Sequence, residues 1–129
     1  MPHMHVEYSK GFATGNAPEN LCQVLHGAMV DAGIFPLAGI RVRAFCADVS
    51  IVADGLPEND FVAMTLTVGA GRATETLKQA GDAIFAAAQT ALADRLSTPH
   101  FALSLEIRVS DPALSWKDTP IHARISNKD

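Results

Sequence analysis

Residues 61–96 read FVAMTLTVGAGRATETLKQAGDAIFAAAQTALADRL, a strand pattern followed by a glycine turn and a helix pattern. The first eight residues predict a strand that ends at Gly69-Ala70-Gly71-Arg72. Residues 74–96 predict a helix, because apolar side chains recur along one side of it at spacings of three and four. That side is rich in alanine, so the helix is expected to lie close to a sheet; its members are Leu77, Ala80, Ile84, Ala87, Ala88, Ala91 and Leu92.

The first part of the chain carries the same order of patterns. Residues 2–8, PHMHVEY, alternate as a short strand, with Met4 and Val6 on one side and His3, His5 and Glu7 on the other. Residues 16–32 predict a helix, because Pro18 lies in its first turn and Gly33 lies just past its end.

Two more strands are expected. Residues 40–52, IRVRAFCADVSIV, alternate with period two, which places Arg41 and Arg43 on the face opposite the apolar one. Residues 53–60 hold Gly, Pro, Asn and Asp and predict a turn. Residues 101–109, FALSLEIRV, predict a fourth strand, and the apolar patch at 121–125 is interpreted as an edge strand.

Strand, helix, strand, twice over, predicts an α+β fold of doubled β-α-β type in one domain, residues 1–129. Right-handed crossovers would place both helices on one face of a four-stranded sheet. The other face would be bare. Because that face mixes arginines with apolar side chains, we expect sister subunits to bury it.

Composition excludes several classes of protein. The chain has 129 residues, 48% hydrophobic and 19% charged, which is typical of a globular domain. Its net charge is −4 and its Lys and Arg residues are scattered, which argues against nucleic-acid binding. With no signal-like start and no long apolar run, it is expected to be cytoplasmic. Cys22 and Cys46 show no metal-ligand spacing and are expected to stay unpaired.

Pro2 is the first candidate for chemistry. If Met1 is removed, as is usual before a small residue, the chain begins with a secondary amine at the start of a strand. An apolar pocket or a nearby cation lowers the pKa of such an amine, and a neutral amine near pH 7 is a general base. The alternative is a Met-Pro start without catalytic meaning.

Arginines supply the second kind of candidate. Guanidinium groups at Arg41 and Arg43 have the geometry to hold carboxylates, unless they are simply solvated on an exposed face. The 69–72 turn, with Arg72 beside backbone N–H groups at a helix start, suits an anionic group. The alternative there is a plain turn with a capping arginine, and the turn lacks a dinucleotide-binding fingerprint.

Other combinations of polar residues are weaker. His3 and His5 lie on one side of the first strand, but no third metal ligand follows at useful spacing, so no metal is expected. Asp48 and Asp54 lack a partner that would make an acid and base couple.

Four stretches resemble the 5-carboxymethyl-2-hydroxymuconate Δ-isomerase family of the tautomerase superfamily. They are PHMHVEYS at the start, GIFPLAGIRVRAFCADVSIVADG at 33–55, FVAMTLTVGAGRATETLKQAG at 61–81 and ALSLEIRVSDPALSWK at 102–117. The resemblance implies a homotrimer without metal or organic cofactor, acting in homoprotocatechuate degradation. It implies a catalytic proline at Pro2 and substrate-binding arginines at Arg41 and Arg72.

The implied reaction converts 5-carboxymethyl-2-hydroxymuconate to its 2-oxo-3-ene isomer, with Pro2 moving the proton. A retained Met1 would block it, because an amide nitrogen is not such a base. Two alternatives stay open: another tautomerase-superfamily enzyme acting on a 2-hydroxymuconate-like acid, and a non-catalytic binding protein on the same fold, although the CxxC of cytokine-type relatives is absent here.

Overall fold

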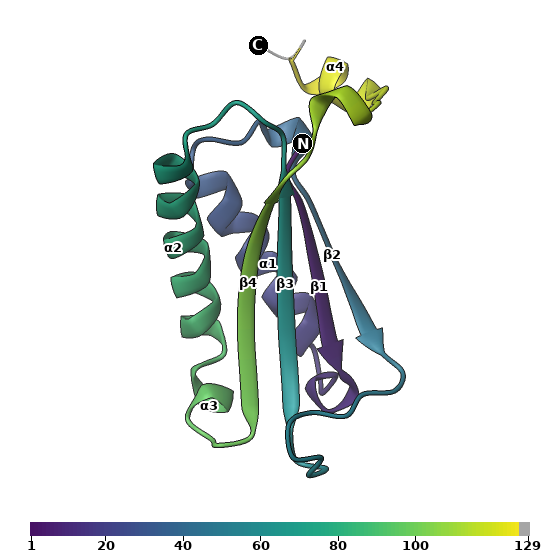
Figure 1. Ribbon diagram of the computed structural model, residues 1–129, viewed down its shortest axis with the longest axis vertical. Helices are drawn as coiled ribbons and strands as arrows, with labels where there is room; N and C mark the ends of the chain where they lie inside the picture. The colour runs from purple at the N-terminus through teal and green to yellow at the C-terminus, as the bar shows by residue number, and fades with distance from the viewer. Residues whose placement is uncertain (127–129) are drawn as a thin grey trace.

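The computed structural model describes residues 1–126, and Figure 1 shows a sheet with long helices running alongside it. The strands are β1 (His3–Ser9), β2 (Arg41–Ala47), β3 (Asp60–Val68) and β4 (Phe101–Val109). The α-helices are α1 (Ala17–Asp31), α2 (Thr74–Ala91), α3 (Ala93–Leu96) and α4 (Pro120–Ser126). Short 3-10 turns are η1 (Lys10–Phe12), η2 (Leu37–Gly39) and η3 (Pro112–Leu114).

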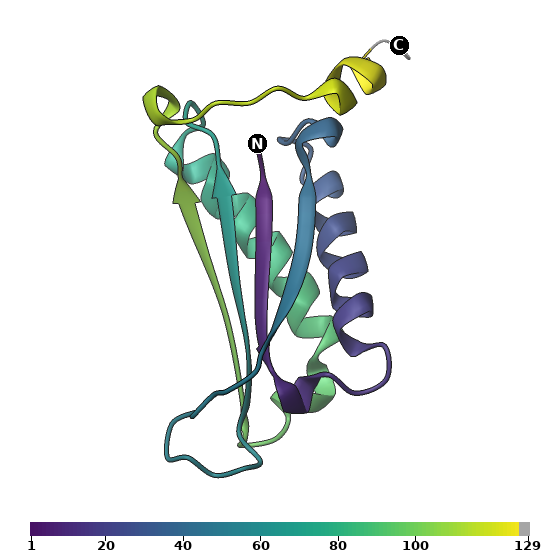
Figure 2. The same ribbon diagram turned by 90° about the vertical axis from the view of Figure 1, so that its right-hand side faces the viewer.

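The sheet has the order β2-β1-β3-β4. β1 pairs with β2 in parallel and with β3 in antiparallel orientation, and β3 pairs with β4 in parallel. Figure 2 shows α1 and α2 together on one side of this sheet. The predicted α+β fold of two β-α-β units with both long helices on one face is therefore confirmed.

The core lies between the sheet and the two long helices, and strand alternation builds it. In β1, Met4 and Val6 are buried, as their spacing predicts. β3 and the helices supply most of the other buried side chains, namely Val62, Met64, Leu66, Val68, Leu21, Leu25, Met29, Leu77, Ile84 and Ala88. β4 is an edge strand, so its inward residues Phe101, Leu103, Leu105 and Ile107 are only half-buried.

The other sheet face carries the polar side chains that alternate with the buried ones along the strands. His3 pairs across the sheet with Arg41 and Thr67, and His5 with Arg43 and Thr65. Beside this face, the connection between β2 and β3 holds two nearly fully exposed apolar side chains, Val49 at 85% and Ile51 at 87% exposure.

β2 is shorter than the strand predicted over residues 40–52. Its pairing with β1 ends where Ser9 faces Ala47, because the chain turns into η1 directly after Ser9. Beyond Ala47 the edge strand has no partner among the described residues, so residues 48–52 leave the sheet. Cys46, near this end, is exposed and Cys22 is half-buried; both thiols are free.

The helix predicted over 74–96 is divided at Leu92, whose backbone departs from helical values at φ −108° and ψ 21°. Arg95, in α3, then lies over aromatic rings at this end of the sheet. The Arg95 guanidinium lies 4.8 Å from the ring centroid of Phe12 and 5.9 Å from that of Phe101. Ala91, assigned to the apolar side, is exposed.

The prediction of an edge strand at 121–125 is wrong, because these residues belong to helix α4. Pro120 at the first helical position favours a helix start, and Ile121 and Ile125 are four residues apart, on one helical face. α4 packs against η2 near the start of the chain, as Figure 2 shows.

A buried hydrogen-bond network fixes the far end of the sheet. Ser9 is 2% exposed; its hydroxyl donates to Asp60 Oδ1 at 2.7 Å and accepts from the backbone N–H of Phe61 at 3.0 Å. Asp60 also faces Arg95, with Nη1 and Oδ2 3.7 Å apart. The Ser9 hydroxyl thus satisfies a backbone donor and a carboxylate together.

Replacing Ser9 by alanine should lower the free energy of unfolding by about 1–3 kcal/mol, because it leaves a buried N–H and a carboxylate oxygen without their partner. The measurement is urea unfolding at one protein concentration, since any self-association shifts apparent stability. Exposed Ser50 is the matched control, and Ser50→Ala should stay within about 0.5 kcal/mol. Equal stability of both variants would contradict this role of Ser9.

Candidate active site

The start of the chain is enclosed between two loops. Pro2 is buried, and its carbonyl accepts a hydrogen bond from the Arg41 backbone N–H at 3.0 Å. Glycines let these loops approach: a Cβ on Gly39 would lie 3.1 Å from Pro2 Cδ, and one on Gly69 would lie 3.5 Å from the Met1 nitrogen. Strand pairing and these close contacts hold the N-terminus in place.

The Arg41 side chain lies beside this N-terminus and is only partly exposed. Its Nη1 donates to the carbonyl of Gly39 at 2.9 Å and to that of Ala38 at 3.4 Å, both in η2. The same nitrogen lies 4.0 Å from the Met1 sulfur. Backbone carbonyls therefore orient the guanidinium without cancelling its charge.

Arg72 approaches from the turn between β3 and α2. Its Nε donates to the carbonyl of Ile34 at 3.2 Å and its Nη1 to that of Gly69 at 3.4 Å. The guanidinium carbon lies 5.2 Å from the centroid of the Phe35 ring, a cation–π contact. The 69–72 turn is thus bridged to the loop after α1 by the arginine that the sequence singled out.

Electrostatics at the N-terminus favour a neutral amine. Burial lowers the pKa of the Met1 α-amino group below its ordinary value of 8.0, and the charges of Lys117, Arg72 and Arg41 lower it further. Among residues 1–126 the ion pairs are Arg95–Asp60 and Arg108–Glu106, so neither Arg41 nor Arg72 is neutralised by a carboxylate there.

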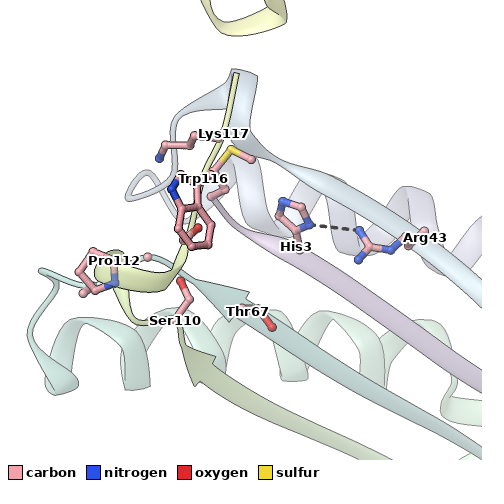
Figure 3. Close-up of a pocket in the computed structure, with 11 residues that line it drawn as sticks. His3, Arg43, Thr67, Ser110, Pro112, Trp116 and Lys117 are labelled. Carbon is pink, nitrogen blue, oxygen red and sulfur yellow. Dashed lines mark hydrogen bonds between the residues drawn. The ribbon is translucent and has the colours of Figure 1, made fainter. Parts of the chain in front are cut away.

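A cavity of about 530 Å³ opens beside the chain start, within the range of small-ligand sites. Figure 3 shows Trp116 and Lys117 on the segment after β4, with His3 and Arg43 on the sheet. The described lining residues are Met1, His3, Arg43, Thr67, Gly69, Ala70, Ser110, Pro112, Ser115, Trp116 and Lys117. Arg41 and Arg72 are not in that set, so the structure places them next to the amine and not along this cavity wall.

A second, smaller cavity of about 180 Å³ also borders the chain start. Its described lining residues are Met1, Pro36, Ala38, Gly39, Lys117, Thr119 and His122. The residues that sequence reasoning missed, such as Ser110, Trp116 and Lys117, come from an irregular segment without periodicity. The lone tryptophan next to a lysine was the available signal.

The two strand histidines have separate partners. His3 Nδ1 lies 3.3 Å from Arg43 Nη1. Because arginine only donates, His3 accepts here, so its proton sits on the other ring nitrogen. Burial first, then the charges of Arg43 and Arg41, lowers the pKa of His3 from 6.5. The His5 ring instead stacks on Phe45, with centroids 4.8 Å apart.

Other candidates stay apart from this site. Within residues 1–126 no three His, Cys, Asp or Glu side chains gather in a way that would hold a metal ion. Asp54 accepts from the Asn59 side chain at 2.6 Å in the β2–β3 connection, at the opposite end of the sheet from the chain start (Figure 1). No helix in the described part of the chain has the length and apolar character needed to cross a membrane.

The arrangement suits proton transfer on a carboxylated molecule. A neutral amine is a base, and surrounding cations attract carboxylates and stabilise negative charge that develops during the transfer. The cavity beside the amine offers both polar and apolar walls, including the Trp116 ring.

Comparisons with known proteins identify the family of this chain. A family model described as 5-carboxymethyl-2-hydroxymuconate isomerase matches residues 2–125. The 5-carboxymethyl-2-hydroxymuconate Delta-isomerase of Escherichia coli is 37% identical over 123 residues, which cover 95% of this chain and 98% of that protein. The crystal structure of a 5-carboxymethyl-2-hydroxymuconate isomerase from Deinococcus radiodurans R1 has a TM-score of 0.87 at 37% identity, covering 96% of this chain and 93% of that one.

The doubled β-α-β fold and the enclosed chain start define a small isomerase of the tautomerase superfamily. Within that class, the family match spans nearly all of the described residues. The chain belongs to the 5-carboxymethyl-2-hydroxymuconate isomerase family.

The lowered pKa of His3 predicts a pH dependence. Between that pKa and 6.5 the unfolded chain binds more protons than the folded chain, so the free energy of unfolding falls as pH falls through this window. Arg43→Gln should raise the His3 pKa toward 6.5 and so narrow the pH range over which stability changes. NMR titration of the His3 ring measures this pKa. Arg108→Gln, a variant of an exposed arginine paired with Glu106, should leave the titration unchanged. An unshifted His3 in Arg43→Gln would contradict the prediction.

Proposed function

We propose that the chain isomerises 5-carboxymethyl-2-hydroxymuconate to its 2-oxo-3-ene isomer in homoprotocatechuate degradation, with the secondary amine of Pro2 as general base. The observation that carries the proposal is the buried position of Pro2 beside the Met1 α-amino group, whose pKa is lowered by burial and by the charges of Lys117, Arg72 and Arg41. Family membership and the name of the Escherichia coli relative support the substrate.

In the proposed reaction the Pro2 nitrogen takes the proton of the 2-hydroxyl group. The C2–O bond becomes a carbonyl, the C2–C3 double bond moves to C3–C4, and the C4–C5 electron pair takes up a proton at C5. The protonated amine supplies that proton, so the base is regenerated and no redox change occurs. A neutral amine of moderate pKa suits both halves of this cycle.

Arg41 and Arg72 are the proposed substrate-binding residues. Both guanidiniums are oriented by backbone carbonyls and keep further N–H donors for a ligand, since each arginine has five. Their role is to bind substrate carboxylates and to stabilise the dienolate that forms when the hydroxyl proton leaves.

Removal of Met1 is part of the proposal, because Pro2 is a base only with a free nitrogen. Met1 lines both cavities at the chain start, and its nitrogen lies where Gly69 leaves space. Without Met1, the amine moves to Pro2 near the same cations, and both cavities lose one of their lining residues.

Pro2→Ala should lower kcat/KM at least ~10²-fold, because a differently placed and more flexible primary amine replaces the ring nitrogen. Turnover of 5-carboxymethyl-2-hydroxymuconate is the measurement. Pro57→Ala, in the exposed β2–β3 connection, is the matched control and should keep full activity.

Mass spectrometry of the same preparations supplies a second comparison. Activity should follow the fraction of chains that begin at Pro2. Co-expression with methionine aminopeptidase, which acts before the folded chain encloses Met1, should raise both that fraction and the activity. Full activity in chains with Met1 intact would overturn the role of Pro2.

The homotrimer is also proposed. A fused 4-OT described as a symmetric trimer shares the fold, with a TM-score of 0.65 at 18% identity over 90% of this chain and 93% of that one, which shows the fold alone. In this chain the sheet face opposite the helices is uncovered, and Phe45, Val49 and Ile51 are exposed beside it. The cavity at His3 and Arg43 opens on that face, so a neighbouring subunit would border it.

Sedimentation velocity at micromolar concentration should show a trimer. Ile51→Asp should shift the protein toward monomer, because the carboxylate would be buried without a partner. Val30→Asp, on the outer side of α1, is the control and should stay trimeric. A well-folded wild-type monomer would contradict the assembly.

A further inference from the structure

The proposed substrate carries three carboxylates, two on the muconate chain and one on the carboxymethyl branch. The two arginines assigned to it leave one carboxylate without a cationic partner. The branch is attached at C5, the carbon that receives the proton, and its carboxylate is two bonds from that carbon. A cation for the branch must therefore lie beside the amine.

Lys117 occupies such a position. Among the described residues, Met1 and Lys117 are the two that line both the 530 Å³ and the 180 Å³ cavity. Lys117 follows Trp116 on the segment after β4, opposite the sheet residues of the cavity in Figure 3. It approaches the chain start from a different element than Arg41 on β2 and Arg72 after β3.

The charge of Lys117 is available for a ligand. Within residues 1–126 it has no ion-pair partner. Of the cations around the N-terminal amine, it has the largest electrostatic effect. Arg43, the other cation of the larger cavity, is engaged with His3 at 3.3 Å and does not line the smaller cavity.

Resting on the proposed function, we propose that Lys117 binds the carboxylate of the carboxymethyl branch and makes the enzyme favour tricarboxylates over dicarboxylates. The ammonium group is a point charge on a flexible stem, suited to a carboxylate on a rotatable branch, whereas the planar arginine forks suit the rigid conjugated chain. Lys117 is thus a specificity-determining residue outside the predicted arginine pair.

The test compares kcat/KM for 5-carboxymethyl-2-hydroxymuconate with that for 2-hydroxymuconate, which lacks the branch. Lys117→Met should lower this ratio about 10- to 100-fold, as expected for a lost charge-assisted contact. Any change in the amine affects both substrates alike, so the ratio isolates the branch. Lys117→Arg should restore most of the ratio, and Lys78→Met, an exposed lysine of α2, should leave it unchanged. An unchanged ratio in Lys117→Met overturns the inference.

Binding without turnover separates this inference from the proposed reaction. Calorimetric titration with propane-1,2,3-tricarboxylate should show tighter binding than titration with glutarate, and Lys117→Met should remove the difference. The emission of Trp116, the chain's one tryptophan, should respond to the bound acid. If the protein preferred the tricarboxylate through Lys117 but turned over neither muconate, the proposed reaction would be refuted and the Lys117 site would be retained. Turnover without this preference would refute the Lys117 site alone. A protein that neither turned over the muconates nor bound the tricarboxylate would refute both the reaction and the Lys117 site.

Discussion

The pairing of β1 between β2 and β3 is the constraint on which the rest of the structure depends. Chain termini are usually poorly ordered unless a sheet holds them. Here the first strand has hydrogen-bonded neighbours on both sides from His3 onward, and the Arg41 N–H reaches back to the Pro2 carbonyl at 3.0 Å. Gly39 and Gly69 then allow two loops to close on the same point. The terminal amine, ordinarily on a mobile and solvated segment, is therefore held at a fixed place beside the buried Pro2.

Charge near this point differs from charge over the whole molecule. The chain is net negative at −4, yet the N-terminus is surrounded by the cations Arg41, Arg72 and Lys117. The arginines are oriented by carbonyl groups of turns, while the ion pairs of the described residues lie elsewhere, at Arg95 and Arg108. Dipoles position the cations and leave their charge available. That combination attracts anions and disfavours a proton on the amine.

Much of the fold was predictable because local periodicity and long-range burial coincide. Met4 and Val6 alternate in sequence and are buried in the structure, and the apolar stripes of α1 and α2 face the sheet.

The predictions were wrong where a distant segment of the chain determines the structure. β2 ends at Ala47 because its partner β1 turns away after Ser9, and nothing in residues 48–52 themselves indicates this end. At 121–125 the patch was too short to distinguish strand from helix, and Pro120 was the overlooked signal. Pro2, Arg41 and Arg72 stood out by residue type and motif, whereas Lys117 reaches the site through an irregular segment without any repeating pattern.

The segment after β4 crosses the end of the sheet, and α4 packs on η2 beside the chain start (Figure 2). The residues made last among those described therefore cover the residues made first. On the ribosome β1 emerges without its neighbours and waits for β2 and β3, so its pairing is non-local and comparatively slow. The proposed removal of Met1 therefore has its opportunity before residues 110–126 cover the chain start. The order of synthesis keeps the first residues accessible until that later segment folds over them.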